Sequence, residues 1–109
     1  MQSKSLKNLI SLKSLINQYQ ITFNRESGLG RYDVIMQPLD QRRKAVIMEF
    51  KVFHSAKEKD LTETVKNALN QIADKKYDTE LLAKGIQKEQ IRHYGFAFAG
   101  KTVLIAGSS

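Results

Sequence analysis

The chain has 109 residues, of which 41% are hydrophobic and 27% charged, with one proline and no cysteine. This length predicts a single domain over residues 1–109. The lack of cysteine excludes disulfide scaffolds, zinc fingers, iron–sulfur clusters and thiol catalysis, and no apolar stretch reaches the ~18 residues of a membrane-spanning helix. The formal net charge of +7 favours polyanionic partners, nucleic acid before an anionic membrane surface.

The first expected element is an amphipathic helix. Residues 5–19 place leucine, isoleucine and tyrosine on one side of a helical wheel. The serine content and the lack of acids also fit an organellar transit peptide, but no arginine precedes Arg25 and the segment leads directly into a strand pattern at 21–24. These two features favour a structural helix, and we expect a cytoplasmic protein.

The next segments are typical of a hairpin of two strands. Residues 27–30 form a turn with two glycines, and residues 32–37 follow as a strand. After a polar loop, residues 45–53 form an apolar run that only Glu49 and Lys51 interrupt. A run of this kind predicts a strand that is buried on both faces.

The second half of the chain alternates helix and strand. Residues 61–76 carry an amphipathic helical stripe, and a short helical turn at 79–84 ends at a glycine. Residues 93–99 and 101–106 have the pattern of two closing strands joined at Gly100. The order of elements predicts an α/β fold with a mixed central sheet flanked by helices.

Two charged residues inside the apolar strand are the strongest functional signal. Glu49 and Lys51 are two positions apart and therefore project from one face. An unpaired buried ion costs several kcal/mol, so each needs a partner or a purpose. The Glu-x-Lys spacing alone arises by chance in a chain with this many Glu and Lys residues. Asp74-Lys75-Lys76 has a similar acid-x-Lys spacing, but it belongs to a predicted helix at a position that we expect to be solvated. The position inside a buried strand is what makes Glu49 a candidate.

A hairpin centred near Gln41 places Asp33 opposite Glu49, with Cβ atoms roughly 4.5–5.5 Å apart. Two carboxylates this close repel each other unless a cation or a shared proton lies between them. Mg²⁺ satisfies both acids, with Mn²⁺ as a substitute, and Lys51 could hold or deprotonate an attacking water or stabilise charge on a phosphate. A shift of one residue in the pairing would move Asp33 to the other face. A salt bridge of the three residues at the sheet edge is the alternative.

Asp33 followed by Glu49-Phe50-Lys51 resembles the signature of the PD-(D/E)XK nuclease superfamily. Further segments look like the nuclease-like domain that is often found C-terminal to an AAA-type ATPase-like domain. They are residues 24–33, 47–52, 68–72 and 95–101, together with Tyr77. The resemblance covers residues 20–106 and implies a restriction-endonuclease-like αβββαβ core.

The resemblance also implies the roles of individual residues. Asp33 and Glu49 bind the metal, with the Phe50 carbonyl as a further ligand. Lys51 and Gln71 join the two acids as catalytic residues. The residues that it implies at the nucleic acid are Arg25, Glu26, Gly28, Gly30, Arg31 and Tyr77.

What the resemblance implies is a nuclease that uses Mg²⁺ or Mn²⁺ to hydrolyse phosphodiester bonds, with DNA favoured over RNA. An AAA-type ATPase and a second copy of the chain are candidate partners. Residues 1–19 lack the aromatic-His motif and the acid of the family's usual first helix. This departure leaves open a catalytically inactive nuclease-fold module that binds nucleic acid or a protein. A membrane-surface protein that uses the basic first helix is the third alternative.

Overall fold

The computed structural model describes residues 17–26 and 31–108, and all structural statements below refer to this part of the chain. Most of the predicted first helix, residues 5–16, lies outside the described residues, and Tyr19 begins a strand instead of ending that helix. The described elements are the strands β1 (Tyr19–Glu26), β2 (Arg31–Pro38), β3 (Ala45–Val52), β4 (Ile91–Ala99) and β5 (Thr102–Ser108), the helices α2 (Leu61–Lys75) and α3 (Tyr77–Ala83), and the 3₁₀ turn η1 (Lys88–Gln90).

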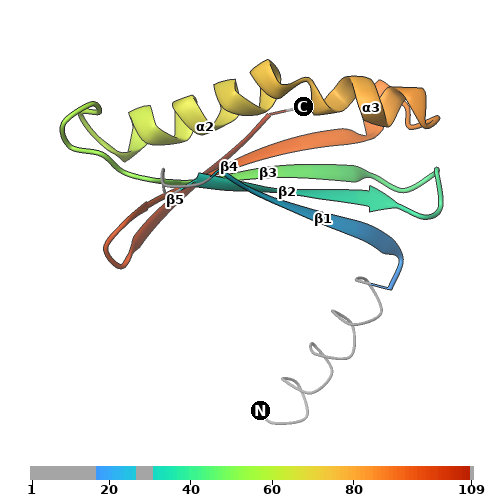
Figure 1. Cartoon of the computed structure of the whole chain (residues 1–109), viewed down its shortest axis with the longest axis horizontal. Coiled ribbons are helices and arrows are strands. Elements are labelled where there is room, and N and C mark those ends of the chain that lie inside the picture. The colour runs from blue at the N-terminus through green and yellow to red at the C-terminus, as the bar shows by residue number, and fades with distance from the viewer. Residues whose placement is uncertain (1–16, 27–30, 109) are drawn as a thin grey trace, which may run out of the picture.

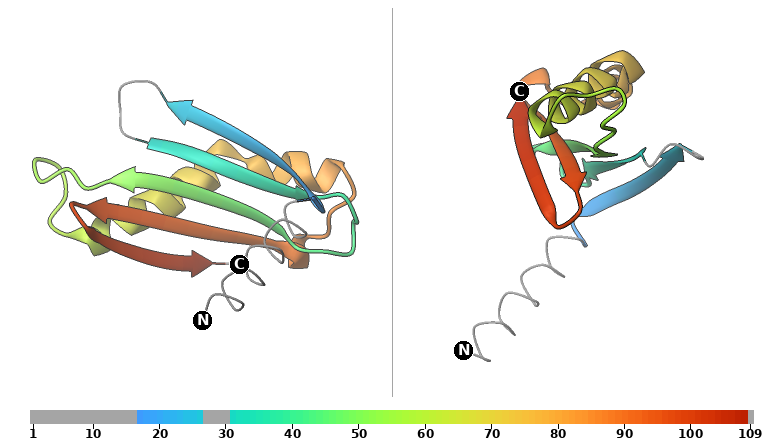
Figure 2. Two further views of the ribbon diagram at one scale, coloured as in Figure 1. Left: turned by 90° about the horizontal axis from the view of Figure 1, so that it is seen from below. Right: turned by 90° about the vertical axis from the view of Figure 1, so that its left-hand side faces the viewer.

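The five strands form one mixed sheet in the order β1-β2-β3-β4-β5. All neighbouring strands are antiparallel except β3 and β4, which are parallel. A parallel pair needs a crossover connection, and α2 and α3 provide it. Both helices lie on the same face of the sheet (Figure 1), and the five strands run side by side when viewed from the opposite face (Figure 2). The predicted α/β architecture with a mixed central sheet is confirmed.

Several elements differ in length from the predicted ones. The first strand is extended at both ends because each of its residues pairs with β2, from Tyr19 opposite Pro38 to Glu26 opposite Arg31. Helix α2 ends one residue early because Lys76 adopts the left-handed conformation, with φ of 57°. The expected helical turn is the helix α3, which begins directly after Lys76.

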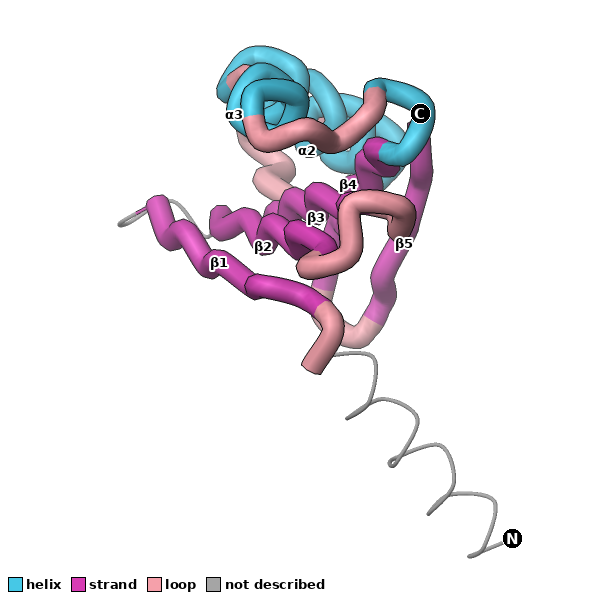
Figure 3. The backbone as a smooth tube through the Cα atoms, turned by 90° about the vertical axis from the view of Figure 1, so that its right-hand side faces the viewer, coloured by secondary structure: helices cyan, strands magenta, loops and turns pink. Residues whose placement is uncertain are grey.

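The two faces of the sheet are buried to different degrees. On β3, Ala45, Ile47 and Glu49 face the helices and are buried, whereas the residues between them are half-buried and Val52 is exposed. The prediction of a strand buried on both faces is therefore wrong, because the described helices cover only one face (Figure 3). On the other face Tyr32, Phe50 and Phe96 form a stack with ring centroids 4.7 and 4.6 Å apart.

The hydrophobic core lies between the helices and the central strands. Ile47 and Ile91 of the sheet meet Ile72 of α2 and Leu81 of α3 in one buried cluster. Removing such side chains from water is the main force that fixes the helices on the sheet. Neither α2 nor α3, the two α-helices of the described chain, has the length and apolar character to cross a membrane.

Gly95 allows α2 to approach the sheet closely beside the predicted site. It lies opposite Glu49 in the register of β3 and β4. A Cβ atom at this position would lie 3.0 Å from the Val65 carbonyl oxygen and 3.2 Å from Leu69 Cγ, both on α2. The missing side chain thus sets the distance between α2 and the strand that carries Glu49.

We expect Gly95→Ala to lower the free energy of unfolding by about 1–3 kcal/mol, because the added methyl group forces α2 away from the sheet. Urea denaturation followed by circular dichroism measures the change. An unchanged unfolding midpoint would mean that α2 does not rest on this position.

Candidate metal-binding and catalytic site

Asp33 and Glu49 form the centre of the site. They are direct partners in the antiparallel pairing of β2 and β3, as the predicted hairpin register requires. Both residues have 0% exposure to solvent. The predicted register is confirmed, and the alternative of a salt bridge at an exposed sheet edge is excluded because both carboxylates are fully buried.

A lysine that we expected at the solvated surface lies against these two acids. Lys75 Nζ is 2.8 Å from Asp33 Oδ2 and 3.6 Å from Glu49 Oε1. The side chain of Lys75 is only 15% exposed. The prediction of a solvated Lys75 is wrong because α2 ends above β2 and β3, so that its last residue reaches the buried carboxylates.

Tyr77 holds the same oxygen of Asp33 from the next helix. Its hydroxyl group donates a hydrogen bond of 2.8 Å to Asp33 Oδ2. Burial, together with this bond and the charge of Asp33, raises the pKa of Tyr77 to about 12. The phenol therefore stays protonated at neutral pH and fixes the orientation of the Asp33 carboxylate.

Lys51 forms an ion pair with Glu58, a residue from the loop before α2. The Lys51 Nζ to Glu58 Oε2 distance is 2.6 Å, and the side chains are 13% and 1% exposed. The Glu58 carboxylate also accepts hydrogen bonds of 3.0 Å from the His54 backbone N–H, 2.9 Å from Thr64 Oγ1 and 2.8 Å from Asn67 Nδ2. Burial by itself raises the pKa of Glu58, but these bonds, led by that from Lys51, outweigh it and lower the pKa to about 2. Glu58 is therefore a firmly ionised anchor for Lys51.

One row of residues on α2 connects the two ion pairs. Its members are separated by three, four and four positions, which places them on one side of the helix, and they are Thr64, Asn67, Gln71 and Lys75. Thr64 and Asn67 contact Glu58, whereas Lys75 contacts the acids. Gln71 is half-buried between them. The predicted catalytic glutamine thus shares its helix face with side chains that reach both parts of the site.

The residues present fit a divalent cation bound by oxygen ligands. Asp33 Oδ1 is buried and accepts no hydrogen bond, so this oxygen is available as a ligand for a cation. Within residues 17–26 and 31–108 there is no group of three or more His, Cys, Asp or Glu side chains that could hold a metal. Two carboxylates are sufficient for Mg²⁺, which commonly keeps several waters and takes its remaining ligands from phosphate. The ring of Phe50 lies in the aromatic stack on the opposite face, and its carbonyl stays a predicted ligand.

Most of the predicted contacts with nucleic acid belong to residues 27–30 or to the strand ends on either side of them. Gly28 and Gly30 are outside the described residues. Arg25 and Glu26 end β1, and Arg31 begins β2 in register with Lys51 of β3. The backbone therefore brings these strand ends to the end of the sheet that carries Lys51.

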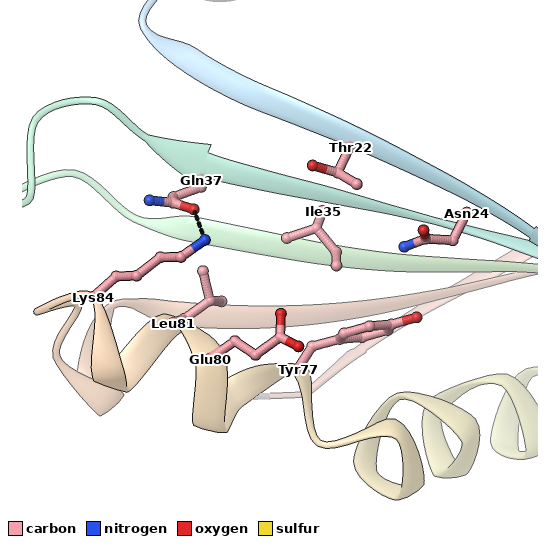
Figure 4. A pocket seen from close by; sticks show the side chains of 8 residues that line it. All are labelled: Thr22, Asn24, Ile35, Gln37, Tyr77, Glu80, Leu81 and Lys84. Atoms are coloured by element: carbon pink, nitrogen blue, oxygen red, sulfur yellow. Dashed lines mark hydrogen bonds between the residues drawn. The ribbon is translucent and has the colours of Figure 1, made fainter.

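A pocket of about 250 Å³ lies next to the acids, between α3 and the first two strands (Figure 4). Tyr77 belongs to both the pocket and the site, and the pocket residue Asn24 is opposite Asp33 in register. Lys84 Nζ donates a hydrogen bond of 3.1 Å to Gln37 Oε1 across it. The lining residues are Thr22, Asn24, Ile35, Gln37, Tyr77, Glu80, Leu81 and Lys84. Most of these side chains are polar, which suits a polar ligand beside the acids.

Comparison with known families places this geometry in context. The sequence profile of the PD-(D/E)XK nuclease superfamily matches residues 6–107. No curated protein and no solved structure matches the chain. The family match spans nearly all of the chain and includes both acids and both lysines of the site. The chain belongs to the PD-(D/E)XK nuclease superfamily.

Proposed function

We propose that this chain is a metal-dependent nuclease that hydrolyses phosphodiester bonds, with DNA as the favoured substrate. The observation that carries the proposal is the pair of fully buried, directly opposed carboxylates of Asp33 and Glu49. Two like charges in a dry environment repel each other strongly. A bound cation offsets this repulsion, so a buried pair of carboxylates favours a cation-binding site.

In this proposal Asp33 and Glu49 hold the cation, with the Phe50 carbonyl as a further ligand. A bound Mg²⁺ or Mn²⁺ acts as a Lewis acid on the phosphate and lowers the pKa of a water molecule. Lys51 is ion-paired with Glu58, so we assign it a charged role, the stabilisation of negative charge on the phosphate. Gln71 contributes an amide group from the same helix face, and Tyr77 keeps Asp33 oriented.

The basic character of the chain supports binding to a polyanion. The net charge is +7, and Arg25 and Arg31 belong to the ends of β1 and β2 that flank residues 27–30. With Glu26, Gly28 and Gly30 they form the proposed contact with the nucleic-acid backbone. Such contacts are electrostatic and weaken steeply with salt.

The test is cleavage of supercoiled plasmid and of single-stranded oligonucleotides by the full chain, in Mg²⁺, in Mn²⁺ and in EDTA. We expect cleavage in the presence of a divalent ion and none in EDTA. DNA binding that persists in EDTA without cleavage under any condition would instead favour the catalytically inactive binding module.

We expect Lys51→Met to lower the cleavage rate by about 10²–10³-fold, the usual effect of removing one group that stabilises transition-state charge. The substitution also leaves the buried Glu58 carboxylate without its cation, so stability falls as well. The double variant Lys51→Met/Glu58→Gln separates the two effects, because it removes both charges. Single-turnover cleavage and thermal unfolding are measured for both variants. Recovery of cleavage together with stability in the double variant would contradict a role for Lys51 in the reaction.

Three further features belong to the proposal. The resemblance to domains that accompany AAA-type ATPases supports such an ATPase as a partner, and we propose a cytoplasmic location. Val103 and Ile105 of the edge strand β5 are exposed by 47% and 53%, and an apolar edge strand supports association with a second copy. Light scattering tests the last point.

A further inference from the structure

We infer that Lys75 is a built-in counter-ion of the metal site, which offsets part of the charge of Asp33 and Glu49 in the metal-free protein and must leave them when a divalent ion binds. This inference rests on the proposed metal site. It adds a residue that competes with the metal and sets how tightly the site binds it.

The ammonium group of Lys75 lies close to both acids of the proposed metal site. The ammonium group of Lys75 contacts a carboxylate oxygen of Asp33 at 2.8 Å and lies 3.6 Å from one of Glu49. It thus lies against both acids that would ligate the metal, and it approaches them from the helix side. A cation at this position offsets the charge of the same two carboxylates that would hold a metal ion.

The charges of Lys75 and of the two acids decide whether the lysine can stay when a metal binds. With Lys75 in place, one positive charge offsets half of the charge of the two fully buried carboxylates, so the metal-free protein has one uncompensated buried negative charge instead of two. A divalent ion balances both acids without help. If Lys75 stayed, its ammonium group would lie within a few ångströms of the metal in a medium that screens charge poorly. The metal and Lys75 therefore exclude each other.

The side chain of Lys75 is able to leave the two acids. It is the last residue of α2, and the backbone turns at Lys76 directly after it. Its side chain is 15% exposed, whereas the Asp33 and Glu49 side chains are at 0%, so the path of the ammonium group to solvent is short. Rotation about side-chain bonds is enough to withdraw it, and no helix has to move.

The consequence is a site that is stable without metal and binds metal less tightly than its two acids alone would allow. Removing the charge of Lys75 should lower the stability of the metal-free protein and raise the affinity of the site for the metal. A residue with only a structural role would not do this, since its loss would loosen the acids and weaken metal binding as well.

The experiment compares the full chain with Lys75→Met by calorimetric titration with Mn²⁺ and by thermal unfolding in EDTA. We expect Lys75→Met to bind Mn²⁺ about tenfold more tightly or better, and its Tm in EDTA to fall by about 10 °C. Lys75→Gln is the second variant, because its amide can still donate to Asp33 and keep the protein folded. Lys66→Met, at an exposed position of the same helix, is the control for overall charge and should change neither value.

Mn²⁺ affinity that is unchanged or weaker in both Lys75 variants overturns the inference and leaves the proposed metal site intact. Loss of Mn²⁺ binding in the wild type and in both variants overturns the metal site and the inference with it. Binding that appears only after the charge of Lys75 is removed supports the inference, since it shows the lysine outcompeting the metal.

Discussion

Glu49→Gln should lower the rate of phosphodiester cleavage in Mg²⁺ by about 10³-fold or more. The substitution removes one of the two charged ligands, and a metal that acts as a Lewis acid supplies several kcal/mol of transition-state stabilisation. Single-turnover cleavage at saturating Mg²⁺ is the measurement. Glu89→Gln removes an exposed acid from η1 and should leave the rate unchanged. A Glu49→Gln variant that cuts at the wild-type rate would show that the site lies elsewhere.

Loss of cleavage in Glu49→Gln should not come from unfolding. Gln has nearly the size of Glu, and in the metal-free protein the variant leaves Lys75 balanced by Asp33 alone. A buried pair with no excess charge is at least as favourable as two acids that share one lysine. We therefore expect the Tm of Glu49→Gln in EDTA to equal or exceed that of the wild type.

The largest effect on stability is expected for Glu58→Ala, which should lose about 3–5 kcal/mol because it leaves the partly buried Lys51 without its anion. Thr64 Oγ1 and Asn67 Nδ2 lose their acceptor at the same time. Urea denaturation monitored by circular dichroism measures the change. Glu63→Ala, which removes another acid from the first turn of α2, is the comparison. A Glu58→Ala variant as stable as Glu63→Ala would contradict the ion pair described above.

The dependence of stability on pH tests the same residue. The folded pKa of Glu58 is about 2 and lies below the ordinary value near 4.5, so the folded state favours the ionised form. Its contribution is fully present above about pH 4.5 and is lost as the pH falls towards 2. We expect the unfolding free energy of Glu58→Gln to fall less than that of the wild type over this range. Parallel pH profiles would contradict the lowered pKa.

The centre of the site could be predicted from the sequence because it depends on local pairing. Asp33 and Glu49 belong to strands joined by a short hairpin, and alternation along a strand fixes which residues share a face. One assumption about the centre of the turn therefore placed the two acids opposite each other, as they are. The burial of β3 was predicted less well, because an apolar run does not reveal whether one or both faces are covered.

Glu58 and Lys75 could not be found in the same way. Glu58 lies between Lys57 and Lys59, and a run of alternating charge in a loop is usually solvated. It is buried only because α2 begins just after it and places Thr64 and Asn67 over its carboxylate. Lys75 meets Asp33 across 42 positions of sequence, and that contact depends on how α2 crosses the sheet. The sequence feature that points to Lys75 is its spacing of four positions from Gln71, which places both residues on one face of the helix.

The central claim is that Asp33 and Glu49 together form a divalent metal site. Calorimetric titration of the wild type and of Asp33→Asn with Mn²⁺ tests it most directly, because it does not depend on finding the right substrate. We predict saturable binding to the wild type that Asp33→Asn abolishes, while the variant keeps the circular dichroism spectrum of the wild type. The claim would be contradicted by equal binding to the wild type and Asp33→Asn, or by a lack of binding to both the wild type and its Lys75→Met variant.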